Sequence, residues 1–129
     1  MAPNPDRLIC EHKDILSHDY PDHFFDITIC TSVIEHIWPK DIHAMSEIVR
    51  VTKPGGTIAL STGMSEANQR IGGEFYYNLT TFMERLIDPY PVSIRGPYDF
   101  SLASSSLDAV DIKKDANHRN WPCTPVYTL

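Results

Sequence analysis

The stretch from FFDITIC (24–30) to TIALST (57–62) decides the fold. The first segment is rich in β-branched and aromatic residues, which predicts a strand. Apolar side chains then recur at helical spacing, at Ile42, Met45, Ile48 and Val49. This pattern predicts a helix that starts near Pro39 and ends before KPGG (53–56), where TIALST begins a second strand. Strand, helix and strand within about 35 residues predict a βαβ unit with parallel strands.

The flanking sequence predicts shorter elements. Leu8–Cys10 is a strand candidate, and residues 63–76 predict a loop with Gly72-Gly73 as a hinge. Residues 79–87 predict an amphipathic helix that Asn78 caps. Short strands are predicted at residues 92–94 and 98–100, and at the end of the chain, around Trp121, Val126 and Tyr127. The nearly continuous apolar character of the two central strands favours a sheet that is covered on both faces.

Composition limits the class of protein. A chain of 129 residues, 42% hydrophobic and 22% charged, is one globular domain or part of one. The net charge of −6 argues against nucleic acid and anionic membranes as partners. Three distant cysteines indicate reduced thiols. No secretory signal and no membrane-spanning run is recognised, so we expect a cytoplasmic protein.

Three segments carry a resemblance to a known family. KDIL (13–16), FFDITICTSVIEHI (24–37) and EIVRVTKPGGTIALST (47–62) follow one another in order, and twelve residues separate Asp14 from Asp26. This arrangement resembles the third, fourth and fifth strands of class I S-adenosylmethionine-dependent methyltransferases, type 11 group. The resemblance implies a Rossmann-like α/β fold with a partial doubly wound, mainly parallel sheet, and methyl transfer to an unidentified small molecule.

The resemblance also implies roles for particular residues. Asp14 would accept a hydrogen bond from the adenine amino group, and the backbone amide of Ile15 would donate to the ring. Thr31, Ser32 and Val33 would line the methionine moiety and the sulfonium. Two structural alternatives stay open: Asp14 as a solvated loop acid, and residues 31–33 as a capped loop that enters a helix.

His36, next to Glu35, falls where the acceptor would face the methyl group. The imidazole is either the general base or a group that orients and packs the site. No metal-ligand spacing occurs among the histidines, so we expect no metal site. Aromatic residues at Tyr76, Tyr77, Phe82 and Tyr98 are either substrate contacts or core.

One diagnostic element of the family does not occur in this sequence: the loop of the form acidic-x-G-x-G-x-G. We therefore expect residues 1–110 to form a partial methyltransferase domain, truncated at its N-terminal side, with residues 111–129 as a polar tail or terminal strand. Strand 24–30 would expose a hydrogen-bonding edge and an apolar face. If the chain is autonomous, residues 7–16 should pair beside residues 26–31.

Three interpretations stay open. The chain is the C-terminal part of a methyltransferase, or an inactive methyltransferase-like subunit or binding module whose edge strand pairs with a partner chain. The third is an unrelated α/β protein, such as a dehydrogenase or nucleotide-binding fragment. Whether the chain is an enzyme is left open, because we expect no methyl transfer from the isolated chain without the contacts for the cofactor's ribose and carboxylate.

Overall fold

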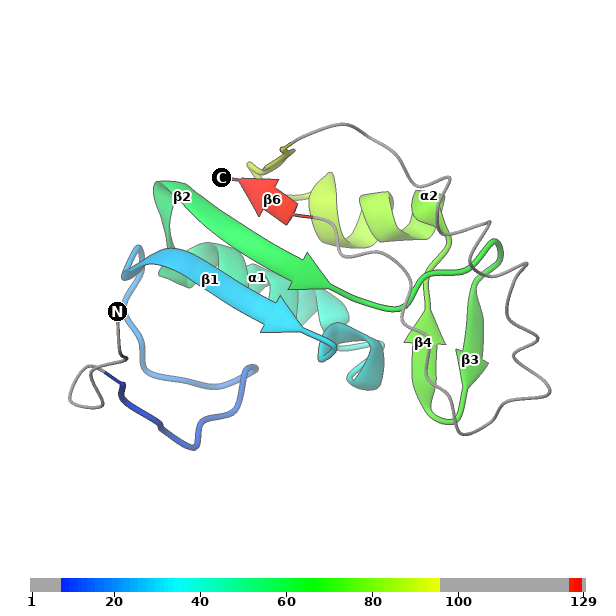
Figure 1. Ribbon diagram of the computed structural model, residues 1–129, viewed down its shortest axis with the longest axis horizontal. Coiled ribbons are helices and arrows are strands. Elements are labelled where there is room, and N and C mark those ends of the chain that lie inside the picture. The colour runs from blue at the N-terminus through cyan, green and yellow to red at the C-terminus, as the bar shows by residue number, and fades with distance from the viewer. Residues whose placement is uncertain (1–7, 96–125, 129) are drawn as a thin grey trace, which may run out of the picture.

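The computed structural model describes residues 8–95 and 126–128. A four-stranded sheet forms its centre, in the order β1-β2-β6-β5 (Figure 1). The strands are β1 (Phe25–Thr31), β2 (Thr52–Ser61), β5 (Ser93–Ile94) and β6 (Val126–Thr128). A separate two-stranded sheet pairs β3 (Gln69–Ile71) with β4 (Glu74–Tyr76). The helical elements are the 3-10 turn η2 (Ile34–His36), α1 (Asp41–Val51), α2 (Leu79–Phe82) and the π-helical turn η3 (Met83–Ile87).

The predicted βαβ unit is present. β1 and β2 are parallel, in a register that runs from Ile27 opposite Thr57 to Thr31 opposite Ser61, and α1 connects them. The fold is therefore α/β, as the sequence predicts. The sheet continues with one reversed strand, because β6 runs antiparallel to both β2 and β5, and β5 therefore has the direction of β1 and β2. None of the described helices has the length and apolarity that a membrane span requires.

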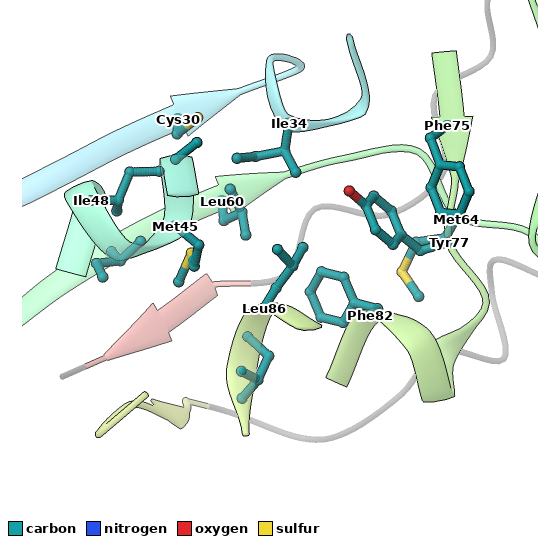
Figure 2. Close-up of a cluster of buried hydrophobic side chains, with 13 residues drawn as sticks. Cys30, Ile34, Met45, Ile48, Leu60, Met64, Phe75, Tyr77, Phe82 and Leu86 are labelled. Carbon is teal, nitrogen blue, oxygen red and sulfur yellow. The ribbon is translucent and has the colours of Figure 1, made fainter. Parts of the chain in front are cut away.

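One hydrophobic core joins the sheet to the helices (Figure 2). Met45 and Ile48 of α1 and Leu60 of β2 are buried together, and Leu86 of η3 completes this part of the core. Tyr77 and Phe82 extend it toward the β3–β4 hairpin, with their rings 6.3 Å apart. Of the aromatic residues with two predicted roles, Tyr77 and Phe82 are thus core, while Tyr98 lies outside the described residues.

β1 is an edge strand in the part of the chain that the structure describes. Its side chains Ile27 and Ile29 are 62% and 69% exposed. The prediction of a sheet covered on both faces is wrong for this strand, and the prediction of an exposed edge with an apolar face is confirmed.

The predicted strand at Leu8–Cys10 is wrong. These residues have no regular structure, and the residues from 8 to 16 do not pair with β1. The chain just before β1 is tied instead to the end of α1, where Arg50 donates to the Tyr20 carbonyl at 2.8 Å and the Phe24 amide donates to the Val51 carbonyl at 2.8 Å. Polar contacts to the helix thus replace the predicted strand pairing.

The loop predicted for residues 63–76 contains the β3–β4 hairpin instead. Ile71 and Glu74 are paired, so Gly72 and Gly73 form a two-residue turn in which both φ angles are positive, 58° and 87°. Only glycine adopts two such angles easily, and Gly-Gly between two short strands is a recognised hairpin signal. The glycines therefore make a turn, and the predicted hinge stays a prediction.

The helix predicted after Asn78 is confirmed, although its last five residues form a π-helical turn. Asn78 Oδ1 accepts a hydrogen bond from the Thr81 amide at 2.8 Å, as a capping residue does. The predicted strand at residues 98–100 and the predicted packing of Trp121 lie outside the described residues. The proposed boundary at residue 110 also lies there and stays a prediction.

Candidate functional site

The loop that leaves β1 is pinned to the end of β2. The Ser32 amide donates to both the carbonyl oxygen and the Oγ of Ser61, each at 3.1 Å. Ser32 has a φ of 53°, a left-handed conformation that is uncommon outside glycine. Thr31 is exposed, and Val33 is half-buried against the core. The carboxyl ends of two parallel strands therefore present hydroxyl groups beside an apolar wall, the place where open α/β sheets bind ligands.

Glu35 follows in η2 and is fully buried. Thr62 Oγ1, just after β2, donates to Glu35 Oε2 at 3.2 Å. Among the residues that the structure describes, no donor lies in hydrogen-bonding geometry with Glu35 Oε1. Burial raises the pKa of this carboxyl, and its own backbone amide and the Thr62 hydroxyl oppose that effect. A half-satisfied acid therefore lies beneath the surface at the carboxyl end of the sheet.

His36 faces the β3–β4 hairpin. Its Nε2 lies 3.8 Å from Glu74 Oε1, and the Tyr76 hydroxyl donates to Glu74 Oε2 at 3.0 Å. The side chain of His36 is 44% exposed, whereas that of Glu74 is 12% exposed. One nearly buried carboxylate, held by a tyrosine, thus lies beside an accessible imidazole.

Close packing holds the hairpin over this region. The rings of Trp38 and Phe75 stack 4.7 Å apart and are almost parallel. Tyr77 donates its amide to the Gly63 carbonyl at 3.1 Å. A Cβ atom at Gly63 would lie 2.9 Å from two ring carbons of Tyr76, so this position accommodates no side chain without movement of the ring. The hairpin lies beyond the arrowheads of β1 and β2 in Figure 1, at the same end as η2.

Asp14 lies in a polar turn that precedes β1. Its Oδ1 accepts a hydrogen bond from the Leu16 amide at 2.9 Å, and its side chain is exposed. Ile15 is half-buried and packs against the same core as Val33. The predicted cofactor contacts at residues 14, 15 and 31–33 stay predictions, because the structure contains no ligand contact that tests them.

The chemistry of these groups fits part of S-adenosylmethionine. An exposed carboxylate at Asp14 suits an amino group, and the hydroxyls and the apolar wall of residues 31–33 suit a sulfonium and its methionine chain. Metal ligands form no comparable arrangement, since no cluster of three His, Cys, Asp or Glu side chains in residues 8–95 and 126–128 could hold an ion.

Sequence reasoning missed Thr62 and Glu74, and it named Tyr76 only as a substrate contact or a core residue. They belong to the site because β2 and the hairpin bring them to η2, and the residues themselves form no local motif. The available signal was the Gly-Gly turn, because a hairpin there would have placed Glu74 and Tyr76 on one face of one strand.

Comparison with known families agrees with this arrangement. Residues 2–60 match a family described as a methyltransferase domain of type 11. Over this segment the chain is similar to methyltransferases of that family. It is 34% identical over 55 residues to 27-O-demethylrifamycin SV methyltransferase of Amycolatopsis mediterranei, and 40% identical over 58 residues to a probable methyltransferase, ltbC, of Aspergillus luteorubrus. Each match covers 43% of this chain and a fifth of the relative's length.

Solved structures share the fold of this chain. A methyltransferase of Mesorhizobium loti aligns with 92% of this chain and 68% of its own, at a TM-score of 0.59 and 12% identity. The [4+2]-cyclase SpnF aligns with 67% of this chain and 32% of its own, at a TM-score of 0.57 and 22% identity. Because a cyclase shares the fold, architecture alone does not establish methyl transfer.

Proposed function

We propose that the chain binds S-adenosylmethionine and takes part in methyl transfer to a small-molecule acceptor. The observation that carries this proposal is the position of Thr31, Ser32 and Val33. They follow a parallel strand at the carboxyl edge of the sheet, and they lie in the segment that matches the methyltransferase family. Ligands of open α/β sheets bind at this edge.

The residues would divide the work of binding. Asp14 would accept from the adenine amino group, and the Ile15 amide would donate to the ring. Thr31, Ser32 and Val33 would line the sulfonium, which supplies an electrophilic methyl group when the cofactor is bound. Ser32 is suited to a fixed position, because two hydrogen bonds to Ser61 hold its amide.

His36 would lie on the acceptor side. Its half-exposed imidazole can take a proton from the acceptor, and Glu74 beside Nε2 would stabilise the charged ring. Orientation of the acceptor carries much of the rate in such a reaction, so a role for His36 in positioning is part of the same proposal.

Calorimetric titration of the 129-residue chain with S-adenosylmethionine tests the proposal. We expect saturable binding, and a dissociation constant about tenfold higher in Asp14→Asn, because a hydrogen bond to a charged acceptor is lost. Asp88→Asn, which changes an exposed acid at the end of η3, is the matched control and should bind as the unchanged chain does. Absence of binding at millimolar cofactor would contradict the proposal.

The exposed edge of β1 favours a second candidate, a methyltransferase-like binding module. Ile27 and Ile29 present an apolar surface beside unpaired backbone groups, a combination that invites strand addition. In this case a partner chain would pair with β1. Hydrogen exchange of the β1 amides, measured as the chain is concentrated, tests pairing between copies. Slower exchange that Ile29→Lys abolishes would support it, and fast exchange at every concentration would exclude it.

A further inference from the structure

Among the residues that the structure describes, none donates a hydrogen bond to the buried Glu35 Oε1. The Glu35 side chain is fully buried, and Thr62 satisfies only the other oxygen. An unpaired buried polar group destabilises a protein, and native structures contain few of them. The arrangement is therefore informative, since an apolar side chain of similar size would fill this position without that penalty.

Polar side chains from three elements lie near the Glu35 carboxyl. Thr62 comes from the end of β2, and His36 is the neighbour of Glu35 in η2. Glu74 comes from β4, which packs directly on η2, and its charge acts on the Glu35 carboxyl. Two acids with one imidazole are rich in acceptors and poor in donors, so the complementary group is a hydrogen-bond donor.

We propose that Glu35 Oε1 receives an O–H or N–H group of the methyl acceptor, so that the acceptor is an alcohol, a phenol or an amine. This inference rests on the proposed function and names the substrate class of the same site. The β3–β4 hairpin packs on η2, so binding at Glu35 Oε1 would require this hairpin to shift. A hydrocarbon or a carbonyl compound carries no donor and would leave the oxygen unpaired.

The acceptor's proton has a nearby destination. His36 lies beside Glu35 in the chain, its imidazole is accessible, and Glu74 Oε1 faces Nε2. This arrangement leaves Nδ1 to take the proton from the acceptor heteroatom, while the Glu74 carboxylate stabilises the resulting imidazolium. Glu35 therefore orients the acceptor, and Glu74 is a positioning residue for His36.

Nuclear magnetic resonance titrations of the full chain with three small probes test the inference without methyl transfer. Phenol and benzylamine carry a donor, and toluene has a similar size without one. We expect phenol and benzylamine to shift the amide signals of Glu35, Thr62 and Glu74, and toluene to leave them unchanged. Equal shifts with toluene would overturn the inference.

Variants locate the donor site. Glu35→Met should raise the dissociation constant for phenol about tenfold or more, as expected for the loss of one hydrogen bond to an acidic group. Glu66→Met, at an exposed acid outside the site, should bind phenol as the unchanged chain does. Unchanged binding in a folded Glu35→Met, checked by circular dichroism, would contradict the inference.

If Glu35→Met does not fold, Glu35→Leu provides the same comparison. Calorimetry with S-adenosylmethionine on the same samples separates the two proposals. If the chain binds the cofactor but does not distinguish phenol from toluene, only the inference about Glu35 is contradicted. If the chain binds phenol selectively but does not bind the cofactor, the proposed function is contradicted and the inference about Glu35 still holds.

Discussion

Two carboxylates, six residues apart, have opposite surroundings although both are fully buried. Asp41, at the start of α1, accepts from Arg85 Nε at 2.9 Å and from the Tyr77 hydroxyl at 2.8 Å. A second arginine nitrogen lies 2.5 Å from its Oδ1. Glu35, in the turn that precedes α1, has Thr62 as the donor to one oxygen and none to the other. Among the described residues, both carboxylate oxygens of Asp41 thus accept hydrogen bonds, whereas only one oxygen of Glu35 does.

The pKa values of the two carboxyl groups shift in opposite directions. Burial acts to raise the pKa of Asp41, but the hydrogen bonds from Arg85 and Tyr77 outweigh it, and the pKa lies below its ordinary value. Burial prevails at Glu35 and raises the pKa. Asp41 therefore joins α1 to η3 and to the residue after β4, as a structural anchor should. Among the described residues, Glu35 has no comparable set of stabilising contacts.

Arg85→Met should have the largest effect on this contrast. It leaves the Asp41 charge buried and without its cation, which costs about 3 kcal/mol in the free energy of unfolding. Urea unfolding followed by circular dichroism measures the loss. Lys53→Met, which removes the cation of the exposed pair with Asp26, is the control and should change stability by less than about 0.5 kcal/mol. Equal losses in the two variants would show that Asp41 is no anchor.

Tyr77→Phe should have the next largest effect. It removes one hydroxyl from Asp41 and keeps the aromatic packing, so we expect a loss of about 2 kcal/mol. Tyr90→Phe is a matched control, because the Tyr90 hydroxyl donates to an exposed backbone carbonyl, that of Ile42. Thermal unfolding should rank Tyr77→Phe clearly below Tyr90→Phe. The reverse order would mean that the Tyr77 hydroxyl is dispensable.

Thr62→Val tests the half-satisfied acid and should have a smaller effect. Loss of the Thr62 hydroxyl, which donates to Oε2, should lower the free energy of unfolding by about 1 kcal/mol. Thr80→Val, at an exposed position in α2, controls for the change of side chain. Chemical unfolding of both variants measures the difference. A Thr62→Val chain as stable as the control would indicate that Glu35 has found another partner.

The dependence of stability on pH should be the smallest effect. A raised folded pKa means that Glu35 contributes stability below its ordinary pKa of about 4.3 and loses it as the pH rises through the folded value. A lowered pKa means that Asp41 contributes above its ordinary value and loses stability as the pH falls. Urea unfolding at several pH values should show Glu35→Gln gaining on the unchanged chain from acid to neutral pH. Asp41→Asn should lose ground over the same range, and parallel curves for both variants would refute the assignment.

The fold could be predicted where a pattern was local. Alternation between β-branched strands and the helical spacing of Ile42, Met45 and Ile48 identified the βαβ unit, because both depend on near neighbours in the chain. The strand at Leu8–Cys10 failed because an apolar run of three residues fits many structures, and contacts from Arg50 decided the path of the chain there. Turn chemistry at Gly72-Gly73 was present in the sequence and was interpreted as a hinge.

The site could be predicted only in part. Residues 31–36 are consecutive, so the edge they form follows from the end of one strand. That Glu35 is buried with one oxygen unpaired depends on Thr62 and on Glu74, which lie 27 and 39 positions farther along the chain. Hydrogen bonds between side chains so far apart in the sequence depend on how the chain packs. They cannot be predicted from the spacing of residues.

Gly63 shows how a residue without a functional group can tune one. Because Gly63 has no side chain, the ring of Tyr76 lies against the backbone at this position. The hydroxyl of this ring donates a hydrogen bond to Glu74. Even a methyl group at position 63 would displace the Tyr76 ring and so change the position of the Glu74 carboxylate relative to His36. A substitution at Gly63 would therefore change the position of Glu74 while every polar side chain near His36 stays the same.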